Sequence, residues 1–416
     1  MSTDGLRYGL LGLPLAFLAL PLYVSLPAYY AREHGLALAS LGALLLGARA
    51  ADALLDPLIG RLSDGWLRPG RVRPVLGAAA LLMLLAFAAL FFPPPLSGNA
   101  LLAWAGLMLV VAYLGFSVLS ISHQAWGARL GGNAQAQTRI HAWREGFALL
   151  GVLLASVLIS TAGWGATTAA LALLLLAGLL ALFGSPLPAP VLAAQPLRWS
   201  LPWRTPGFRR LLLVYAVNGI AAAVPATVLL FFVRDRLQAP QWEAGFLVAY
   251  FAAAALALPL WLRAVGRLGQ ARSWLLAMGL AVLSFVWAAS LGAGDGMPFL
   301  VICLASGAAA GADLAIPPAM LARVVQQTGL GGRAEGAFFG WWTAASKLNL
   351  ALAAGLALPL LQALGYRDGA RDAEALQALS WVYALLPCVL KLIAMALLWA
   401  LWLRPGPSAF ALESTR

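Results

Sequence analysis

The fold class is decided by residues 74–92, which read PVLGAAALLMLLAFAALFF. This run has no charged residue over about the length needed to cross the hydrocarbon core of a bilayer. The whole chain agrees with it, because 62% of the 416 residues are hydrophobic, 10% are charged and the mean hydropathy is +0.87. A backbone in lipid must satisfy its own hydrogen bonds, and long uninterrupted apolar runs favour helices over the alternating strands of a barrel. We therefore expect an all-α polytopic membrane protein.

Apolar runs separated by helix-breaking residues predict about twelve spans. They lie near residues 8–30, 36–63, 74–92, 100–128, 140–163, 166–184, 209–233, 242–264, 272–292, 297–322, 336–364 and 376–403. A stretch rich in proline and arginine separates the sixth span from the seventh, as expected for two parallel repeats. We expect an N-terminal six-helix bundle with the cation site at 1–184, a cytoplasmic linker at 185–208 and a C-terminal six-helix bundle at 209–416.

Arginine residues gather at alternate ends of these spans. One side of the membrane receives Arg61, Arg68, Arg71, Arg73, Arg129, Arg139, Arg144, Arg198, Arg204, Arg263, Arg267, Arg323 and Arg333. The positive-inside rule makes that side cytoplasmic, together with both termini, and predicts a multi-pass protein of the inner (plasma) membrane. The net charge of +12 does not indicate nucleic-acid binding, since the arginines form no compact surface with interleaved aromatic residues.

Three ionisable residues lie inside the second predicted span. Asp52 and Asp56 are four residues apart, and Arg49 precedes the first by three, so all three share one helical face. Buried ionisable groups are costly, and two neighbouring carboxylates repel each other unless a cation or a proton compensates them. Pro57 removes one helical hydrogen bond beside them. The sequence thus predicts a site for Na⁺ or H⁺; a salt bridge that only holds helices together is the alternative.

Two lysines also lie within predicted spans. Lys347 in span eleven needs a negative partner, for which the surplus carboxylate of span two is the expected choice. Such a contact would join the two halves and would weaken when a cation binds, as alternating access requires. The alternatives for Lys347 are snorkelling to the interface or a pair with Asp313 in span ten. Lys391 in span twelve has no evident partner, and we expect it to snorkel or to play a minor pore role.

The remaining polar residues give little support for catalysis. The two cysteines, Cys303 and Cys388, fall in apolar runs and behave as small hydrophobic residues. His123 and His141 flank the turn between spans four and five, as structural residues or proton relays, and the neighbours Arg144 and Glu145 are expected to pair. There is no metal-spaced cluster, nucleophile elbow or nucleotide-binding loop. We expect no enzyme activity, no cofactor other than a coupling ion, and a monomer.

Several motifs resemble those of the glycoside-pentoside-hexuronide:cation symporters of the major facilitator superfamily, a melibiose-carrier-like family. The most specific is RAADALLDPLIGRLSD, residues 49–64, which matches the pattern R-xx-D-xxx-DP-xxG-xxxD. Further similarity covers the basic loop 68–74, the stretch from Ser122 through Trp126 to Glu145, and residues 311–347 of spans ten and eleven. The resemblance therefore runs through most of the chain and implies the major facilitator fold.

The resemblance also implies roles for individual residues. In that family the two carboxylates of span two bind Na⁺, Li⁺ or H⁺ and a lysine of span eleven takes part in coupling, which points to Asp52, Asp56 and Lys347. Arg49 and Ser122 complete the expected cation site. We assign gating to Asp64, Arg68, Arg71, Glu145 and Asp313, and substrate binding to Tyr23, Trp126, Arg144, Tyr215 and Trp342.

Two departures from the family pattern bear on the substrate and the ion. Where melibiose carriers have an aspartate opening the span-four motif, this chain has Ser122, and the sugar-binding aspartate of span one falls near Ala16. Losing an anionic ligand disfavours a hard metal cation, which favours H⁺ over Na⁺. Losing the sugar-binding acid admits a more apolar substrate.

Four functions are compatible with these observations. The first is symport of a small organic solute, such as a sugar or glycoside, with H⁺ or Na⁺. The second is a proton-coupled exporter or a lipid or lysolipid transporter of the same fold. The others are a non-transporting membrane sensor or assembly protein, and an intramembrane enzyme, which the sparse catalytic residues disfavour.

Overall fold

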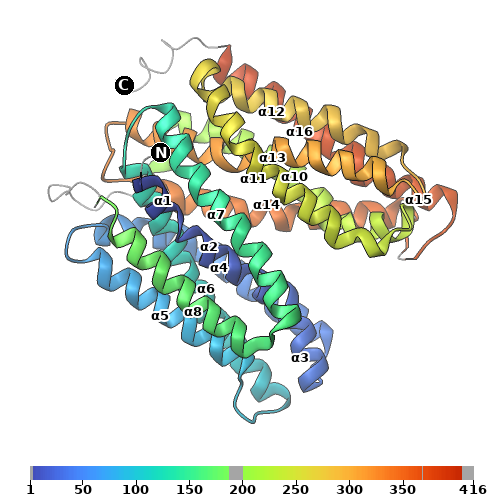
Figure 1. The fold of residues 1–416 in the computed structure, drawn as a ribbon, viewed down its shortest axis with the longest axis horizontal. Coiled ribbons are helices and arrows are strands. Elements are labelled where there is room, and N and C mark those ends of the chain that lie inside the picture. Colours follow the sequence, from blue (N-terminus) through green and yellow to red (C-terminus); the bar gives the residue numbers. More distant parts are fainter. Residues whose placement is uncertain (1–2, 187–199, 368, 405–416) are drawn as a thin grey trace. The chain divides into compact units, whose positions relative to one another are not determined.

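The structure is a computed structural model that describes residues 3–186, 200–367 and 369–404, and every regular element in these ranges is helical (Figure 1). The predicted all-α class is therefore confirmed. The first half of the chain forms α1 (Thr3–Gly9), α2 (Gly12–Leu20), a π-helical turn (Pro21–Ser25), α3 (Leu26–His34), α4 (Leu38–Trp66), α5 (Val72–Phe91), α6 (Gly98–Arg129), α7 (Ala134–Thr161) and α8 (Gly163–Phe183).

The second half continues with helices of similar length. They are α9 (Leu201–Arg204), α10 (Pro206–Phe231), a π-helical segment (Phe232–Arg236), a 3₁₀ turn (Pro240–Trp242), α11 (Glu243–Leu268), α12 (Gln270–Phe285), a 3₁₀ segment (Val286–Ser290), α13 (Gly296–Gln327), α14 (Glu335–Ala363), α15 (Ala373–Ser380), a π-helical segment (Trp381–Leu385), α16 (Leu386–Leu398) and a π-helical end (Trp399–Leu403).

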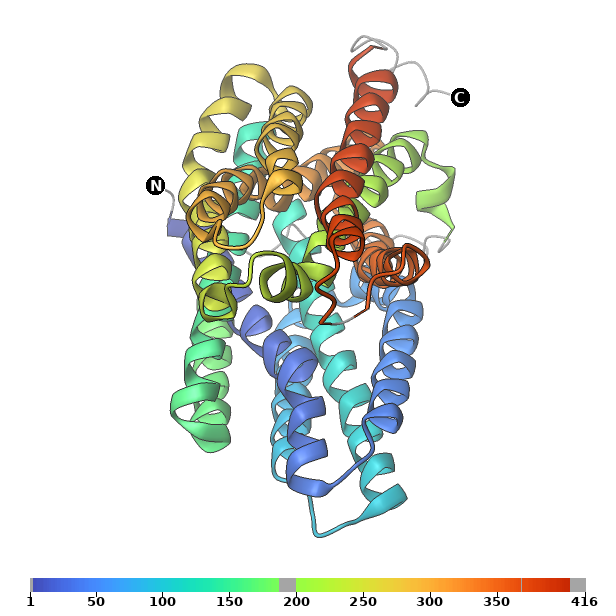
Figure 2. The same cartoon turned by 90° about the vertical axis from the view of Figure 1, so that its right-hand side faces the viewer.

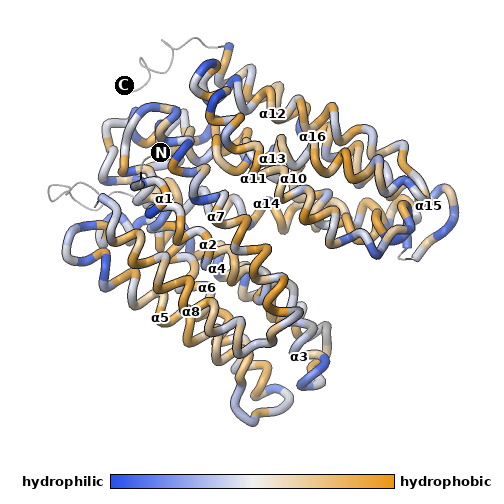
Figure 3. The backbone as a smooth tube through the Cα atoms, viewed as in Figure 1, coloured by the Kyte–Doolittle hydropathy of each residue, from blue (hydrophilic) through white to orange (hydrophobic). Residues whose placement is uncertain are grey.

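Ten helical segments of the described ranges are long and apolar enough to cross a membrane. The two further predicted spans differ from these for physical reasons. The first is divided into α1, α2, a π-helical turn and α3, and the second is α4, which is long enough but carries the charges of the span-two motif. Figure 3 shows hydrophobic residues along the long helices and hydrophilic residues gathered mainly at the turns that join them.

The chain forms two compact units. The first contains Met1–Pro202 and Val325–Ala344, and the second contains Trp203–Val324 and Ala345–Arg416. Residues 335–344 of α14, which the sequence assigns to the C-terminal bundle, thus pack with the first unit, whereas the rest of α14 belongs to the second. Within the first unit, α5 packs against both α6 and α8 (Figure 1), and Figure 2 shows the blue α4 beside the cyan α6.

Each unit has its own hydrophobic core. In the first, aromatic residues such as Phe17, Phe87 and Trp126 are fully buried among leucine and alanine side chains. In the second, Phe232 stacks on Tyr383 with ring centroids 4.0 Å apart, and Phe246 meets Phe299 edge-on at 4.8 Å. These pairs stabilise the packing of helices that are already apolar on most faces.

Candidate functional site

Asp52 and Asp56 lie one helical turn apart on α4 and are buried. Their exposed fractions are 4% and 0%, whereas Leu54 and Leu58 of the same helix are 80% and 50% exposed. Since side chains four apart share a helical face, both carboxylates point into the protein while the leucines point outward. Burying two acids on one face costs free energy unless cations, protons or hydrogen-bond donors compensate their charge.

Two other residues of α4 lie close in sequence to these acids. Arg49 lies three residues before Asp52 with a half-buried side chain. Pro57 lies inside α4, where its ring nitrogen cannot donate to the carbonyl of Ala53, so that carbonyl loses a helical donor. Within the described ranges, no group of three or more His, Cys, Asp or Glu residues is placed to hold a metal ion. The acid pair of α4 is therefore not joined by a third such residue within these ranges.

Ser117 of α6 contacts the acid pair directly. Its hydroxyl donates to Oδ1 of Asp52 at 2.7 Å, and its side chain is fully buried. Ser122, the residue expected in the cation site, lies on the same helix but accepts a hydrogen bond from Nε1 of Trp66 at 3.0 Å. The structure therefore places Ser117 beside the carboxylates and gives Ser122 a different partner.

This difference leads to a first prediction. Ser117→Ala removes a charge-assisted hydrogen bond, so the cation concentration for half-maximal uptake should shift by about tenfold, since such bonds contribute roughly 1.5–3 kcal/mol. Ser122→Ala, a matched change on the same helix, should shift it little. Solute uptake measured against pH and against Na⁺ concentration checks both variants. An unchanged cation dependence in Ser117→Ala would contradict the assignment.

Next to Asp56, α4 touches the start of α14 backbone to backbone. A Cβ atom added to Gly340 would lie 2.6 Å from the carbonyl oxygen of Asp56, and one added to Gly60 would lie 2.8 Å from Cα of Gly340. A Cβ on Gly336 would also overlap the carbonyl of Gly60. Small residues four apart allow membrane helices to approach this closely. The three glycines thus fix the first turns of α14 against the acid-bearing part of α4.

A buried charge network joins the ends of α4, α6 and α14. Arg129 donates to Asp64 at 2.8 Å, to Glu335 at 3.0 Å and to the carbonyl of Leu67 at 2.9 Å. Asp64 also accepts from the backbone N–H groups of Gly336 and Ala337, at 2.8 and 3.0 Å. These N–H groups belong to the first turn of α14 and have no acceptor within the helix, so a carboxylate at this end is favourable. The network is arranged as an ionic latch that holds three helix ends together.

The expected gating residues are distributed over several places. Asp64 lies in this latch, and its ion-pair partner is Arg129. Neither Arg129 nor the third member of the latch, Glu335, was among the residues expected from the sequence. Arg68 is half-buried and Arg71 is exposed in the turn after α4. Glu145 forms the expected pair with its neighbour Arg144 on α7.

The aromatic and histidine candidates of the first unit mostly pack in its core. Nε2 of His123 lies 2.8 Å from the carbonyl of Tyr8, whose hydroxyl donates back to the carbonyl of His123 at 3.0 Å. Trp126 is fully buried and donates to the carbonyl of Pro186. This placement favours packing over substrate stacking for Trp126, and a structural role for His123. Trp342 is also buried, 3% exposed, on α14.

The second unit contains a buried network around Asp313 of α13. Lys391 of α16 donates to Oδ2 of Asp313 at 2.7 Å, while Trp274 of α12 and Asn218 of α10 donate to Oδ1 at 2.7 and 3.1 Å. Nζ of Lys391 also donates to Oδ1 of Asn218 at 2.8 Å. The expectation that Lys391 lacks a partner is therefore wrong, and the alternative pairing of Lys347 with Asp313 is wrong as well. Lys347 lies half-buried on α14.

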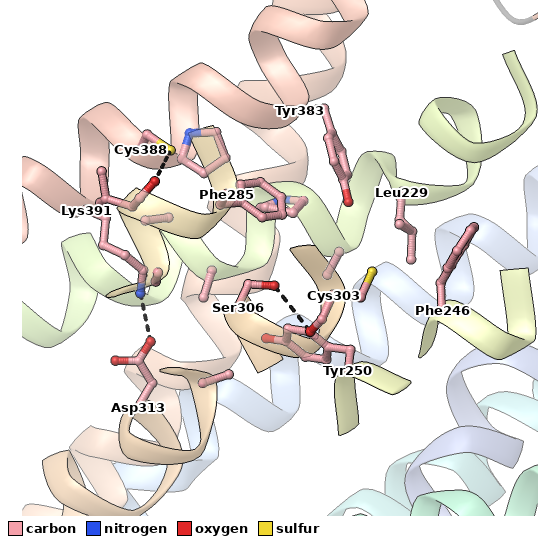
Figure 4. Close-up of a pocket in the computed structure, with 18 of the residues that line it drawn as sticks. Leu229, Phe246, Tyr250, Phe285, Cys303, Ser306, Asp313, Tyr383, Cys388 and Lys391 are labelled. Atoms are coloured by element: carbon pink, nitrogen blue, oxygen red, sulfur yellow. Dashed lines mark hydrogen bonds and ion pairs between the residues drawn. The ribbon is translucent and has the colours of Figure 1, made fainter. Parts of the chain in front are cut away.

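A cavity of about 150 Å³ opens beside this network. Its lining is mainly apolar and comes from α10, α11, α12, α13 and α16. Figure 4 shows Asp313 and Lys391 at one end of the cavity, with Phe246 and Leu229 toward the other. Tyr215, an expected substrate residue of this unit, is not among the residues that line the cavity, and its hydroxyl shares a 2.6 Å hydrogen bond with that of Ser346. The side chain of Tyr23, an expected substrate residue of the first unit, lies outside the described part.

The profile of the family described as MFS/sugar transport protein matches residues 7–404. The chain belongs to this family. It is a multi-pass membrane transporter of the major facilitator superfamily and not an enzyme, which confirms the expected family, fold and absence of catalysis. Bilayer lipid is its surrounding solvent, and a small molecule is its substrate.

Individual relatives of this transporter are distant. The Inner membrane symporter YicJ of Escherichia coli (strain K12) is 28% identical over 132 residues, which are 32% of this chain and 29% of that protein. A bacterial homologue of the iron transporter ferroportin in an outward-facing state has a TM-score of 0.70 at 18% identity, covering 97% of this chain and 100% of that one. The transporter FucP in the outward conformation gives 0.66 at 14% identity, covering 93% and 97%. These structures establish the shared fold.

Proposed function

We propose that this transporter couples the movement of a small organic solute to a cation, H⁺ or Na⁺, bound at Asp52 and Asp56. The observation that carries the proposal is the pair of fully or nearly fully buried carboxylates one turn apart on α4, one of them bonded to Ser117. Two acids in this position bind a small cation because the cation relieves their mutual repulsion and their desolvation. The similarity to an inner membrane symporter supports the same reading.

Coupling also requires that occupancy of the site changes the packing of helices. Gly340 meets the backbone of Asp56, and the latch of Asp64, Arg129 and Glu335 lies at the end of the same two helices. A shift of α4 on cation binding would therefore be transmitted directly to α14, which carries Lys347 farther along. We retain Lys347 as the coupling lysine and Asp64 as a gating residue within the proposal.

We place the protein in the inner (plasma) membrane with both termini cytoplasmic. The support is the concentration of arginine at alternate ends of the spans, together with the name of the YicJ relative. Single cysteines at the exposed positions Arg272 and Ser97, each in a variant whose native Cys303 and Cys388 are replaced by serine, check this orientation by reaction with an impermeant maleimide on intact cells. Only the cysteine at position 97 should react.

A second candidate function, export or lipid transport in the same fold, is favoured by the apolar cavity of the second unit. Sugar hydroxyls need several convergent polar groups, whereas this cavity offers aromatic and aliphatic side chains with charges at one end. The two candidates share the cation site and differ in the chemistry of the solute.

A thermal-stability screen in detergent or nanodiscs tests the proposal. The panel contains monosaccharides, glycosides, organic acids and lysolipids, each with and without Na⁺ and at two pH values. A transported solute should raise the melting temperature, and the coupling cation should increase that shift, because ligands that bind only the folded state stabilise it by mass action. If no solute in the panel shows such synergy with either cation, a non-transporting sensor or assembly protein is the better interpretation.

A further inference from the structure

The cavity of the second unit has a hydrophobic body and a single charged end. Its walls include Phe246, Tyr250, Phe285 and Tyr383, and the ion pair of Asp313 and Lys391 forms the polar end (Figure 4). Ligand sites typically combine such an apolar lining with a few placed polar groups that orient the ligand. The chemistry of this end therefore determines which head group the cavity accepts.

The carboxylate of Asp313 is already well supplied with donors. It accepts from Lys391 through Oδ2, and from Trp274 and Asn218 through Oδ1. A cationic ligand would find one acceptor position left on the carboxylate, and it would be repelled there by the ammonium group of Lys391. The carboxylate thus acts as a fixed part of the protein and is a poor receptor for a cation.

The ammonium group of Lys391 is in the opposite situation. It has three N–H donors, and the described residues supply two acceptors, Asp313 and Asn218. The third donor belongs to a side chain that lines the cavity. Because Trp274 and Asn218 also stabilise the charge of Asp313, the carboxylate does not need the third N–H of Lys391, which stays available to a ligand. A head group that accepts hydrogen bonds and carries negative charge completes this arrangement.

We propose that the cavity binds an amphipathic organic anion, with a carboxylate or sulfonate on Lys391 and an aromatic or alkyl body among Phe246, Tyr250 and Phe285. This inference rests on the proposed function only in treating that anion as the transported solute. Binding itself requires neither an ion gradient nor the acids of α4. The proposal therefore narrows the solute class from small organic molecules to hydrophobic acids.

The two cysteines of the chain provide a direct readout of cavity occupancy. Cys303 and Cys388 are the only cysteines in the sequence, and both line this cavity. A ligand in the cavity shields them from a small thiol reagent, methyl methanethiosulfonate, whose adducts are counted by mass spectrometry of the full-length protein in nanodiscs. The probes are 4-phenylbutyrate, 4-phenylbutanol and 4-phenylbutylamine, which share one skeleton, and the disaccharide lactose.

We expect phenylbutyrate to slow labelling of both thiols. Phenylbutanol should need about tenfold higher concentration for the same protection, because a hydrogen bond to a charged group contributes at least that factor. Phenylbutylamine and lactose should give none at the concentrations where the acid protects. Equal protection by acid and alcohol, or protection by the amine or by lactose, overturns the proposal.

Variants link the preference to Lys391. Lys391→Gln should reduce the ratio between acid and alcohol to about one, but it leaves a buried acid without its cation and can unfold. The double variant Asp313→Asn with Lys391→Gln removes both charges together, and it should fold and show the same loss of preference. Arg234→Gln, which removes an exposed arginine paired with Glu243, should keep the tenfold ratio. A preference that persists in the double variant refutes the role of Lys391.

One further variant separates this inference from the proposed function. Asp52→Asn removes a proposed cation ligand in the other unit and should leave thiol protection by phenylbutyrate unchanged. Protection together with normal coupled uptake in Asp52→Asn would refute the cation site and keep the anion site. Cation-coupled transport of a solute that never protects the thiols would refute the assignment of the cavity to the transported solute and would keep the cation site.

Discussion

Asp56→Asn and Asp52→Asn should each abolish uphill accumulation of the solute in energised vesicles while the protein stays folded. The substitution keeps the shape of the side chain and removes the charge that holds the cation. Loss of one charged ligand is expected to weaken cation binding by about tenfold or more, since interactions with charged groups contribute roughly 1.5–3 kcal/mol. The loss of cation affinity should be larger for Asp56→Asn than for Asp52→Asn, because Asp56 is fully buried.

The measurement compares gradient-driven uptake with exchange of solute at equal concentration on both sides. Exchange needs no net ion movement, so it should persist in the variants when accumulation is lost. Asp372→Asn is a matched control, because Asp372 is an exposed residue that caps α15 through the N–H of Ala375, and asparagine can cap a helix equally well. Normal accumulation in both α4 variants would remove the basis of the coupling proposal.

The sequence was sufficient for the features that depend on a single helix. Residues four apart share a face in any helix, so the burial of Asp52 and Asp56 on one side of α4 follows from spacing and from the cost of a charge in lipid. The pairing of Arg144 with Glu145 is likewise local. The helical class was predicted from the apolar runs and the family from the resemblance of the motifs, and both are confirmed. Of the twelve predicted spans, ten correspond to helices of the described ranges that are long and apolar enough to cross a membrane.

Features that depend on the register between helices could not be derived in this way. Ser117 and Ser122 lie on the same α6, and nothing in their local sequence tells which hydroxyl lies level with Asp52. A single helix also gives no sign that Lys391 meets Asp313, 78 residues away in the chain. The rule that a buried charge needs a partner was applied to Lys347, whereas Lys391 was expected to snorkel, so its pairing with Asp313 was missed.

The ionic latch shows a second reason for such misses. Arg129 and Glu335 lie at helix ends, where charged residues are common and usually solvated, so neither was distinguished from its neighbours by sequence. Their burial becomes evident only when α4, α6 and the first turns of α14 are packed together. The glycines that allow this packing, Gly336 and Gly340, stood within a motif whose family resemblance gave no physical reason for them.

Gly60→Ala should lower the melting temperature of the protein, although the same change elsewhere on α4 should not. A methyl group on Gly60 would meet the backbone of Gly336 and Gly340, and backbone atoms cannot move aside as the end of a side chain can. Overpacking of this kind costs about 1–3 kcal/mol. Gly340→Val should be at least as damaging, because its side chain would press on the carbonyl of Asp56.

The control for this prediction is Gly47→Ala, also on α4, where no atom lies within 4 Å of the added methyl group. Alanine favours helix over glycine by roughly 1 kcal/mol, so Gly47→Ala should leave the melting temperature unchanged or raise it. The two variants thus have opposite expected signs on one helix. If Gly60→Ala is as stable as Gly47→Ala and transports solute with normal cation dependence, α4 and α14 do not approach as closely as the glycines indicate, and cation binding near Asp56 cannot be transmitted to α14 through this contact.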